Sequence, residues 1–133
     1  MIGIVVVSHS FRLAQGVAEL ARAAAGAEVR LATAGGLDLP GQPLGTDAAA
    51  IVRAIEEVYS DDGVLILMDL GSALLSAEMA LDLMAPERRA RVALCAAPLV
   101  EGAVAAAVQA GLGSSLEQAM SEALGALQPK SEH

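Results

Sequence analysis

The sequence contains almost no aromatic residues, since its 133 positions include one Phe, one Tyr and no Trp. Proteins that bind single-stranded nucleic acids stack bases on aromatic side chains, so this composition argues against that function. Basic residues are also scarce, because 8 Lys and Arg stand against 16 Asp and Glu, and the net charge is −8. Such a surface repels nucleic acids and anionic lipids, and it suits small ligands or a partner with a basic face. We therefore expect neither a nucleic acid nor a membrane as partner, although the charge could also serve solubility alone.

Cysteine and histidine are nearly absent as well. The single cysteine, Cys95, excludes an internal disulfide and fits a reducing, cytoplasmic location. It lies within the apolar run VALCAA and is interpreted as a buried core thiol. The two histidines are His9 and His133, so no His/Cys cluster has the spacing of metal ligands. The sequence therefore predicts no metal site.

One segment, VALCAAPLVEGAVAAAVQAGL at 92–112, is long and apolar enough to resemble a membrane span. Pro98, Glu101 and Gly102 interrupt its middle, where the pattern changes from continuous to helical. We interpret this segment as a buried strand followed by a helix, and the chain as soluble.

Short apolar runs alternate with helical patterns along the chain. The runs at 2–7, 28–34, 64–69 and 91–97 are typical of strands buried in a parallel sheet. Each helix is predicted from apolar residues that share one face, and these are Leu13, Val17, Leu20 and Ala24; Ile51, Ile55 and Val58; Leu74, Ala77, Leu81 and Met84; Val100, Val104, Ala107 and Gly111; and Leu116, Met120, Ala123 and Leu127. This order predicts one α/β domain over 1–128, with a parallel four-stranded sheet of order 2-1-3-4 and helices on both faces. Residues 129–133 are predicted to form a flexible tail.

The predicted strand order brings two polar segments to the same edge of the sheet. The first strand ends in Ser8-His9-Ser10, and the third ends in Asp69-Leu70-Gly71-Ser72. In a sheet of this order, the direction of winding reverses between strands 1 and 3 and leaves a crevice at their carboxyl ends, where ligands bind. We therefore expect His9 and Asp69 to face each other across this crevice.

A histidine at a strand-to-helix junction lies beside free backbone N–H groups at the positive end of a helix dipole, which bind phosphate and favour a neutral imidazole. An aspartate that accepts a hydrogen bond from one ring nitrogen would leave the other nitrogen free to attack. His9 is thus the candidate nucleophile, and Asp69 orients it. The small neighbours offer hydroxyl and N–H groups to a transferring phosphoryl group, and these are Ser8, Ser10, Gly71 and Ser72. The alternatives are a structural histidine in a turn and plain helix capping by Ser10 and Ser72, although a serine can cap a helix and bind a phosphoryl group at once.

A long loop leaves the same edge of the sheet after the second predicted strand. Residues 35–45 are too rich in Gly and Pro for regular structure, and Thr46 is predicted to cap the helix that follows. Loops of this length are often functional, and the alternative is an ordinary surface loop.

Several phosphate-handling folds are excluded by missing motifs. No GxGxxG follows the first strand and no GxxxxGK[ST] occurs, so we do not expect this chain to bind a nucleotide itself. A two-component receiver would need an acidic pair after the first strand, and a histidine phosphatase would need Arg-His-Gly there. This chain has Ser-His-Ser instead.

Four segments resemble one family: VVVSHSFRLAQGVAEL, the GG…P…GTDA stretch at 35–48, MDLGSALLSAEMALDL and LCAAPLVEGA. The family is the phosphotransferase subunit of phosphoenolpyruvate-dependent dihydroxyacetone kinase, whose N-terminal domain is similar to the mannose-type enzyme IIA of the sugar phosphotransferase system. The resemblance covers about residues 1–112. It implies an α/β domain that forms a homodimer and carries phosphate on His9, surrounded by Ser8, Ser10, Asp69, Gly71 and Ser72. Gly36 and Thr46 belong to the matching loop as candidate contacts of less defined role.

The resemblance also implies partners. The phosphoryl group would come from the histidine carrier protein and pass to ADP on the nucleotide-binding subunit, which then phosphorylates dihydroxyacetone held by a third subunit. No cofactor is expected on this chain, because ADP and magnesium belong to the partner. The alternatives are a IIA domain that serves a mannose-type sugar permease, and a non-catalytic regulatory module. Mannose-type relatives exchange a fifth strand near the C-terminus, but 114–127 is predicted to be helical here, and the Ala/Val face of 100–112 could form the dimer interface.

Overall fold

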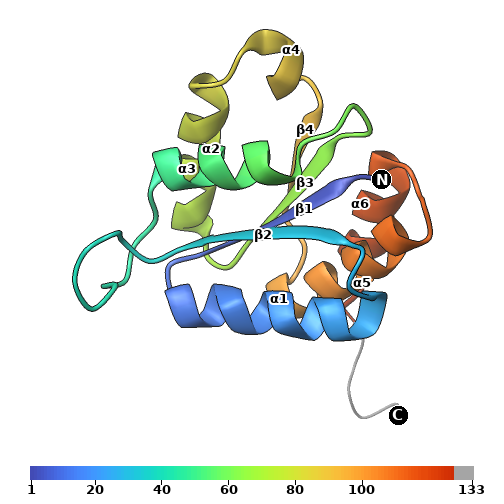
Figure 1. Ribbon diagram of the computed structural model, residues 1–133, viewed down its shortest axis with the longest axis horizontal. Coiled ribbons are helices and arrows are strands. Elements are labelled where there is room, and N and C mark those ends of the chain that lie inside the picture. Colours follow the sequence, from blue (N-terminus) through green and yellow to red (C-terminus); the bar gives the residue numbers. More distant parts are fainter. Residues whose placement is uncertain (128–133) are drawn as a thin grey trace.

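The computed structural model describes residues 1–127, which form an entirely parallel, four-stranded sheet between two layers of helices (Figure 1). The strands are β1 (Gly3–Ser8), β2 (Arg30–Gly35), β3 (Val64–Met68) and β4 (Val92–Cys95). Their order in the sheet is β2-β1-β3-β4. The predicted fold class and strand order are therefore confirmed, while the predicted tail at 129–133 lies outside the described residues.

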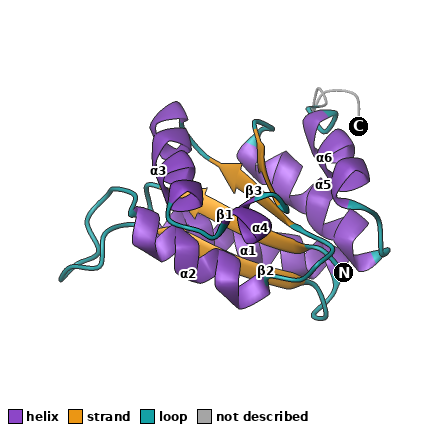
Figure 2. Cartoon of the chain, turned by 90° about the horizontal axis from the view of Figure 1, so that it is seen from above, coloured by secondary structure: helices purple, strands orange, loops and turns teal. Residues whose placement is uncertain are grey.

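The helices cover both faces of the sheet. One face packs against α1 (Phe11–Ala25), α5 (Leu99–Gly111) and α6 (Leu116–Leu124), and the other against α2 (Ala48–Val58) and α3 (Gly71–Asp82) (Figure 2). A single helical turn, α4 (Pro86–Arg89), leads into β4 and was not predicted from the sequence. Among the described residues, no helix is long and apolar enough to cross a membrane.

The ends of the strands are aligned, and this alignment positions the residues that follow them. In the register of the sheet, Val7 pairs with Met68 and Ser8 pairs with Gly35. His9 after β1 and Asp69 after β3 are therefore brought to the same edge. The long loop after β2 leaves that edge too and projects from the body of the protein (Figure 1).

The predicted core faces differ from the structure in α1 and α5, because alanines and not the larger predicted residues face the sheet there. In α1, Leu13 and Leu20 are 43% and 51% exposed. The buried residues of these helices are Ala14, Val17, Ala18 and Ala21 in α1; Ala73, Ala77 and Ala80 in α3; Gly102, Ala103, Ala106, Ala107 and Ala110 in α5; and Ala119 and Ala123 in α6. Small side chains let a helix lie close to its neighbours, which leaves larger side chains at the flanks of the contact. The predicted face of α2 is confirmed, with Ile51, Ile55 and Val58 buried. The predictions for α3 and α6 are largely confirmed, because these residues are buried or pack against the core: Ala77, Leu81, Met84, Leu116, Met120 and Ala123.

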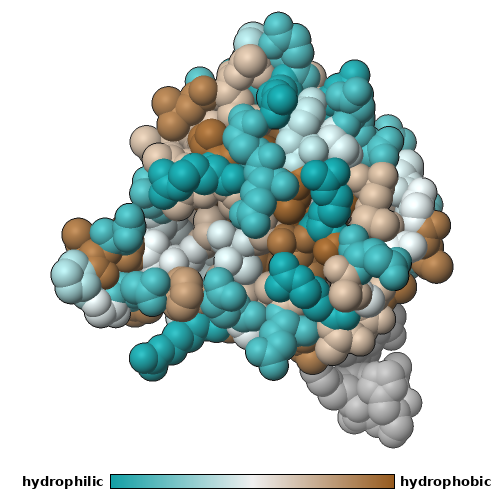
Figure 3. Space-filling view, viewed as in Figure 1, coloured by the Kyte–Doolittle hydropathy of each residue, from teal (hydrophilic) through white to brown (hydrophobic). Residues whose placement is uncertain are grey.

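The alanines of α5 pack within the chain, against α1, α6 and the sheet. These alanines are therefore not available to the dimer interface that the sequence suggested within 100–112, and of the stripe named there Val100 and Gly111 remain exposed. One group of exposed large apolar residues lies on and just after α3, where Leu75, Met79 and Leu83 are 65%, 60% and 67% exposed. In Figure 3, hydrophobic atoms are exposed at the upper left, over the end of α3 that leads to α4. As predicted, the segment after β4 is helical, and no fifth strand follows β4 within residues 1–127.

Candidate active site

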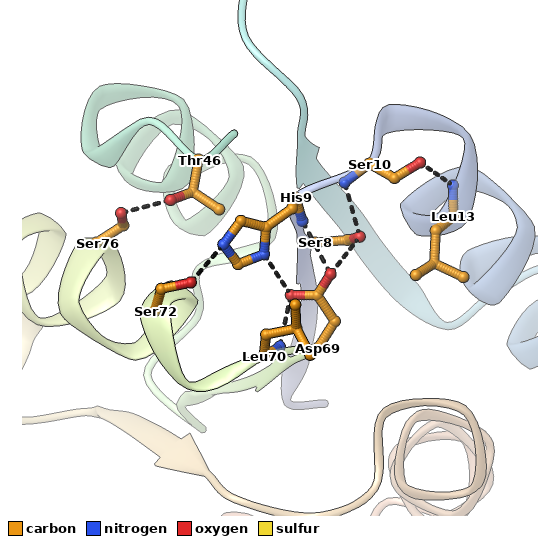
Figure 4. A network of polar contacts seen from close by, with 9 residues as sticks. All are labelled: Ser8, His9, Ser10, Leu13, Thr46, Asp69, Leu70, Ser72 and Ser76. Carbon is orange, nitrogen blue, oxygen red and sulfur yellow. Dashed lines mark hydrogen bonds and ion pairs between the residues drawn. The ribbon is translucent and has the colours of Figure 1, made fainter. Parts of the chain in front are cut away.

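His9 lies directly after β1, at the carboxyl edge of the sheet. Ser8, the last residue of β1, is completely buried, whereas the side chain of His9 is 23% exposed. Helix α1 begins two residues later, and Ser10 caps it by accepting a 3.2 Å hydrogen bond from the N–H of Leu13. The passage from a buried strand to a capped helix thus holds His9 at the surface, with its ring directed toward the segment after β3 (Figure 4).

Asp69 follows β3 and faces His9, as the strand order predicted. Its Oδ1 lies 2.9 Å from Nδ1 of the His9 ring and accepts a 2.7 Å hydrogen bond from the N–H of Leu70. Its Oδ2 accepts hydrogen bonds from the backbone N–H of His9 at 2.9 Å and from the Ser8 hydroxyl at 2.8 Å. The carboxylate therefore binds both the ring and the main chain of the same histidine, which fixes the orientation of the ring.

These hydrogen bonds determine the charge of the Asp69 carboxyl. Burial by itself would raise the pKa of Asp69, but the hydrogen bonds from His9, Ser8 and Leu70 outweigh burial and place the pKa below its usual value. Asp69 is therefore a carboxylate at neutral pH.

The charge of Asp69 in turn determines the tautomer of His9. A carboxylate can only accept hydrogen bonds, so in the neutral imidazole Nδ1 carries the ring hydrogen and Nε2 keeps its lone pair. The hydroxyl of Ser72 lies 2.6 Å from Nε2 and donates to it. The arrangement provides a nucleophilic nitrogen that is oriented by a carboxylate and covered by a single exposed hydroxyl.

The other predicted site residues differ in their exposure. The hydroxyl of Ser8 is buried, accepts a 3.0 Å hydrogen bond from the N–H of Ser10 and donates to Asp69, so it supports Asp69 and is not open to a bound anion. Gly71 is the first residue of α3 and is exposed. Ser72 does not cap α3, because the N-cap position is Leu70 and no side chain caps this helix. The capping alternative is therefore correct for Ser10 and wrong for Ser72.

Four helices follow a strand at this edge of the sheet, namely α1, α2, α3 and α5. The three whose beginnings are joined to His9 or its neighbours, α1, α2 and α3, differ in their first turns from the other helices of the described residues. No acidic residue occurs in the first turn of α1, α2 or α3, whereas α4, α5 and α6 carry Glu87, Glu101 and Glu117 there. No acidic side chain within the first turn of α1 or α3 opposes the positive end of its dipole, and the Asp69 carboxylate, just before the N-cap of α3, is the acidic group that lies beside His9. This local environment favours an anion at a surface that is otherwise acidic.

The loop after β2 is attached to the site by its last residues. The N–H of Gly45 donates a 2.8 Å hydrogen bond to the carbonyl of His9, and the hydroxyls of Thr46 and Ser76 lie 2.5 Å apart. Thr46 does not cap α2, because Asp47 takes that position and accepts a 3.0 Å hydrogen bond from the N–H of Ala49. The prediction of a Thr46 cap is therefore wrong by one residue.

Gly36 lies at the other end of this loop, and no hydrogen bond within the described part of the chain joins it to the His9 ring. It has a φ of +73°, and a Cβ there would lie 3.2 Å from the Cβ of Phe11, so it shapes the turn that begins the loop. Gly36 and Phe11 also line a cleft of about 410 Å³ between the loop and α2, which does not include His9. The cleft is not where the reactive groups are.

Sequence reasoning missed Ser76 and Gly45. Ser76 stands four residues after Ser72, and this spacing on a helix places both hydroxyls on one face. That signal was available in the sequence. The backbone contact of Gly45 could be found only from the structure, because a main-chain N–H has no sequence signature.

Comparisons with known proteins agree with this geometry. Residues 3–120 match the protein family EIIA-man, described as the PTS system fructose IIA component. The chain is 51% identical over 99% of its length to the protein named "PEP-dependent dihydroxyacetone kinase, phosphoryl donor subunit DhaM" of Escherichia coli K12, but it spans only 28% of that relative. It is 39% identical to the corresponding subunit of kinase 2 of Listeria innocua, over 92% of this chain and 96% of the relative.

Two solved structures are also similar. One belongs to a protein of unknown function, with a TM-score of 0.85, 37% identity and 97% of each chain covered. The other is a sigma-54 interaction domain protein from Enterococcus faecalis, with a TM-score of 0.65, 19% identity, and 90% of this chain and 85% of that chain covered. The second likeness shows the fold alone.

Proposed function

The chain belongs to the EIIA-man family, the PTS system fructose IIA component, and we propose that it carries a phosphoryl group on Nε2 of His9. The group would come from the histidine carrier protein and pass to ADP on the nucleotide-binding subunit of a dihydroxyacetone kinase. The third subunit would hold dihydroxyacetone. The similar proteins are named as phosphoryl donor subunits of PEP-dependent dihydroxyacetone kinases, which supports such a kinase as the receiver. ADP and magnesium are assigned to the partner, this chain needs no cofactor, and all components share the cytoplasm.

In the proposed step, the lone pair of His9 Nε2 attacks the phosphorus of the phosphorylated donor. The new N–P bond forms as the bond between phosphorus and the donor's histidine breaks, and the donor nitrogen keeps the electron pair. Asp69 stabilises the positive charge that the ring of His9 gains. The hydroxyl of Ser72 loses its acceptor on Nε2 and donates to a phosphoryl oxygen instead. In the onward step, an oxygen of the β-phosphate of ADP attacks the phosphorus, and Nε2 recovers its lone pair.

The observation that carries this proposal is the pair of contacts on the His9 ring. Asp69 lies 2.9 Å from Nδ1, and Ser72 lies 2.6 Å from Nε2. The first contact fixes the tautomer that can attack, and the second places a donor where phosphoryl oxygens would be. The first-turn N–H groups of α1 and α3, including that of Gly71, supply further donors for a dianion.

A relay assay tests the proposal. The chain is incubated with radiolabelled phosphoenolpyruvate and the general phosphotransferase proteins, and then with the ADP-loaded nucleotide subunit. We expect an acid-labile label on this chain that passes to ATP, and no label on a His9→Ala variant. A His9→Ala variant that still relayed phosphate would overturn the proposal.

The description of the family as a fructose IIA component favours a second candidate, a IIA domain that serves a sugar permease. The phosphorylated chain is therefore also offered a mannose-type IIB domain. Faster transfer to the IIB domain than to the ADP-loaded nucleotide subunit would favour the permease.

We also propose that the chain acts as a homodimer through α3. Leu75, Met79 and Leu83 are spaced four residues apart and form an exposed apolar stripe on one side of α3. Charged substitutions within this stripe, such as Met79→Glu, are expected to convert a dimer to a monomer in sedimentation experiments. An unchanged sedimentation coefficient would place the interface elsewhere.

A further inference from the structure

Two hydroxyls that do not touch the reacting nitrogen of His9 are hydrogen-bonded to each other beside the site. Thr46, at the end of the long loop, and Ser76, in α3, lie with their Oγ atoms 2.5 Å apart and are both partly buried. Figure 4 shows this pair on the side of the His9 ring that carries Nε2, next to Ser72. Neither hydroxyl caps a helix, because Asp47 caps α2 and Leu70 occupies the N-cap position of α3.

The loop that carries Thr46 is hydrogen-bonded to the main chain of His9. The N–H of Gly45 donates to the His9 carbonyl at 2.8 Å, one residue before Thr46. Gly45 has a φ of +151°, and a Cβ at this position would lie 2.8 Å from the side chain of Leu37. A second bond, from the N–H of Leu37 to the carbonyl of Pro43 at 2.9 Å, closes the loop on itself. The loop is therefore an internally bonded unit whose end is attached to His9.

The helix that carries Ser76 is attached to the other side of His9. Ser72 and Ser76 are one turn apart in α3, so their hydroxyls lie on the same face. The Ser72 hydroxyl donates to Nε2 of His9 at 2.6 Å. The contact between Thr46 and Ser76 thus closes a ring of contacts that runs from the His9 carbonyl through Gly45 and Thr46 to α3, and back to the His9 ring.

We infer that Thr46 and Ser76 are positioning residues. Their contact, which we call the clasp, joins the loop to α3 and keeps the His9 ring and the Ser72 hydroxyl oriented toward each other for phosphoryl transfer. Neither hydroxyl contacts the reacting nitrogen, and both act through His9 and Ser72. The inference rests on the proposed function, since the clasp is assigned a role in that transfer. It predicts that loosening the clasp slows the transfer step without unfolding the chain or weakening partner binding.

The test uses Thr46→Val and Ser76→Ala, which each remove one hydroxyl with little change in shape, and the double variant, which removes both. Thr46→Ser retains the hydroxyl and serves as the conservative variant. Two matched controls remove hydroxyl hydrogen bonds elsewhere: Thr33→Val, whose hydroxyl accepts from Gln15 at 2.9 Å, and Ser114→Ala, whose hydroxyl donates to Gln109 at 2.6 Å. Each chain is phosphorylated in single turnover over a range of donor concentrations, and its melting temperature is recorded.

Loss of one hydrogen bond within the site is expected to lower the limiting transfer rate roughly 5- to 10-fold in Thr46→Val and in Ser76→Ala. The donor concentration that gives half of the limiting rate should not change. The double variant should be no slower than either single variant, because both remove the same contact. Thr46→Ser and the two controls should transfer at the wild-type rate. Wild-type rates in Thr46→Val and Ser76→Ala, or losses that multiply in the double variant, would contradict the clasp.

Failure of the proposed function gives a different result, because the wild-type chain itself would then accept no phosphate. The clasp is in that case judged by ¹⁵N NMR of the His9 ring in the unphosphorylated chains. Ring signals that shift in Thr46→Val and Ser76→Ala but not in the controls would support the clasp, and unchanged signals would refute it.

Discussion

Oδ2 of Asp69 accepts the backbone N–H of His9 at 2.9 Å, while Oδ1 of the same carboxylate lies 2.9 Å from that histidine's ring Nδ1. One side chain therefore fixes both the position and the tautomer of His9. The carboxylate is itself held by the buried Ser8 hydroxyl and by the N–H of Leu70. The site is thus assembled from the ends of two neighbouring strands, with β1 supplying the nucleophile and β3 supplying the group that orients it.

Asp69→Asn is predicted to abolish efficient transfer while preserving the fold. The amide keeps the volume of the carboxyl, but its NH₂ group can donate to Nδ1 and so favours the tautomer with hydrogen on Nε2, which cannot attack. In a Ser-His-Asp hydrolase the same change lowers turnover about 10⁴-fold, and we expect a loss of roughly 10³-fold or more here. Single-turnover phosphorylation of the folded variant measures the rate of phosphoryl transfer. A decrease in this rate of less than tenfold would show that Asp69 does not set the tautomer of His9.

Ser72→Ala is predicted to slow transfer without changing stability, whereas Ser10→Ala is predicted to lower stability. Ser72 is exposed and caps no helix, so its removal should slow transfer roughly tenfold, by loss of one donor to the phosphoryl group, and leave the melting temperature unchanged. Ser10 caps α1, so Ser10→Ala should cost about 1 kcal/mol of stability. Transfer rates and urea unfolding of the two variants are compared. A stability loss in Ser72→Ala equal to that in Ser10→Ala would mean that Ser72 is structural.

The lowered pKa of Asp69 predicts a specific loss of stability in acid. Because its pKa in the folded chain lies below the ordinary 3.8, the carboxylate contributes stability that is complete well above pH 3.8 and is lost as the pH falls through the folded pKa. The difference in unfolding free energy between wild type and Asp69→Asn should therefore be constant near neutrality and shrink below about pH 4. Denaturant unfolding at a series of pH values tests this. A difference that grew on acidification would require a raised pKa.

Two glycine substitutions are predicted to change stability in opposite directions. A Cβ at Gly3 would lie 2.4 Å from the carbonyl oxygen of Val58, so Gly3→Ala forces β1 and α2 apart and should cost about 1–3 kcal/mol. A Cβ at Gly16, within α1, would meet no atom within 4 Å. Gly16→Ala should therefore stabilise the chain by about 0.5–1 kcal/mol through helix propensity. Equal melting temperatures for the two variants would contradict the packing of β1 against α2.

The elements that the sequence predicted well are those whose patterns depend on burial alone. Continuous apolar runs located all four strands, and the strand order brought His9 and Asp69 together. The faces of α1 and α5 were predicted poorly because larger apolar residues were assigned to the core. In this chain alanines allow close packing, and residues such as Leu13 and Leu75 remain exposed.

Within the site, the residues that sequence reasoning missed act through tertiary contacts. The Ser76 hydroxyl meets Thr46 from a distant loop, and Gly45 contributes only its backbone N–H. The helix cap was assigned to Thr46 because both Thr46 and Asp47 are favoured at that position. Only the backbone of the loop decides that Asp47 takes it.

The most direct test of the central claim identifies the phosphorylated atom. The ¹⁵N-labelled chain is phosphorylated with phosphoenolpyruvate and the general phosphotransferase proteins, and the ring nitrogens are examined by NMR together with peptide mapping. We predict one acid-labile phosphoryl group per chain, bonded to Nε2 of His9. A phosphoryl group on Nδ1, on another residue, or on no residue at all would contradict it.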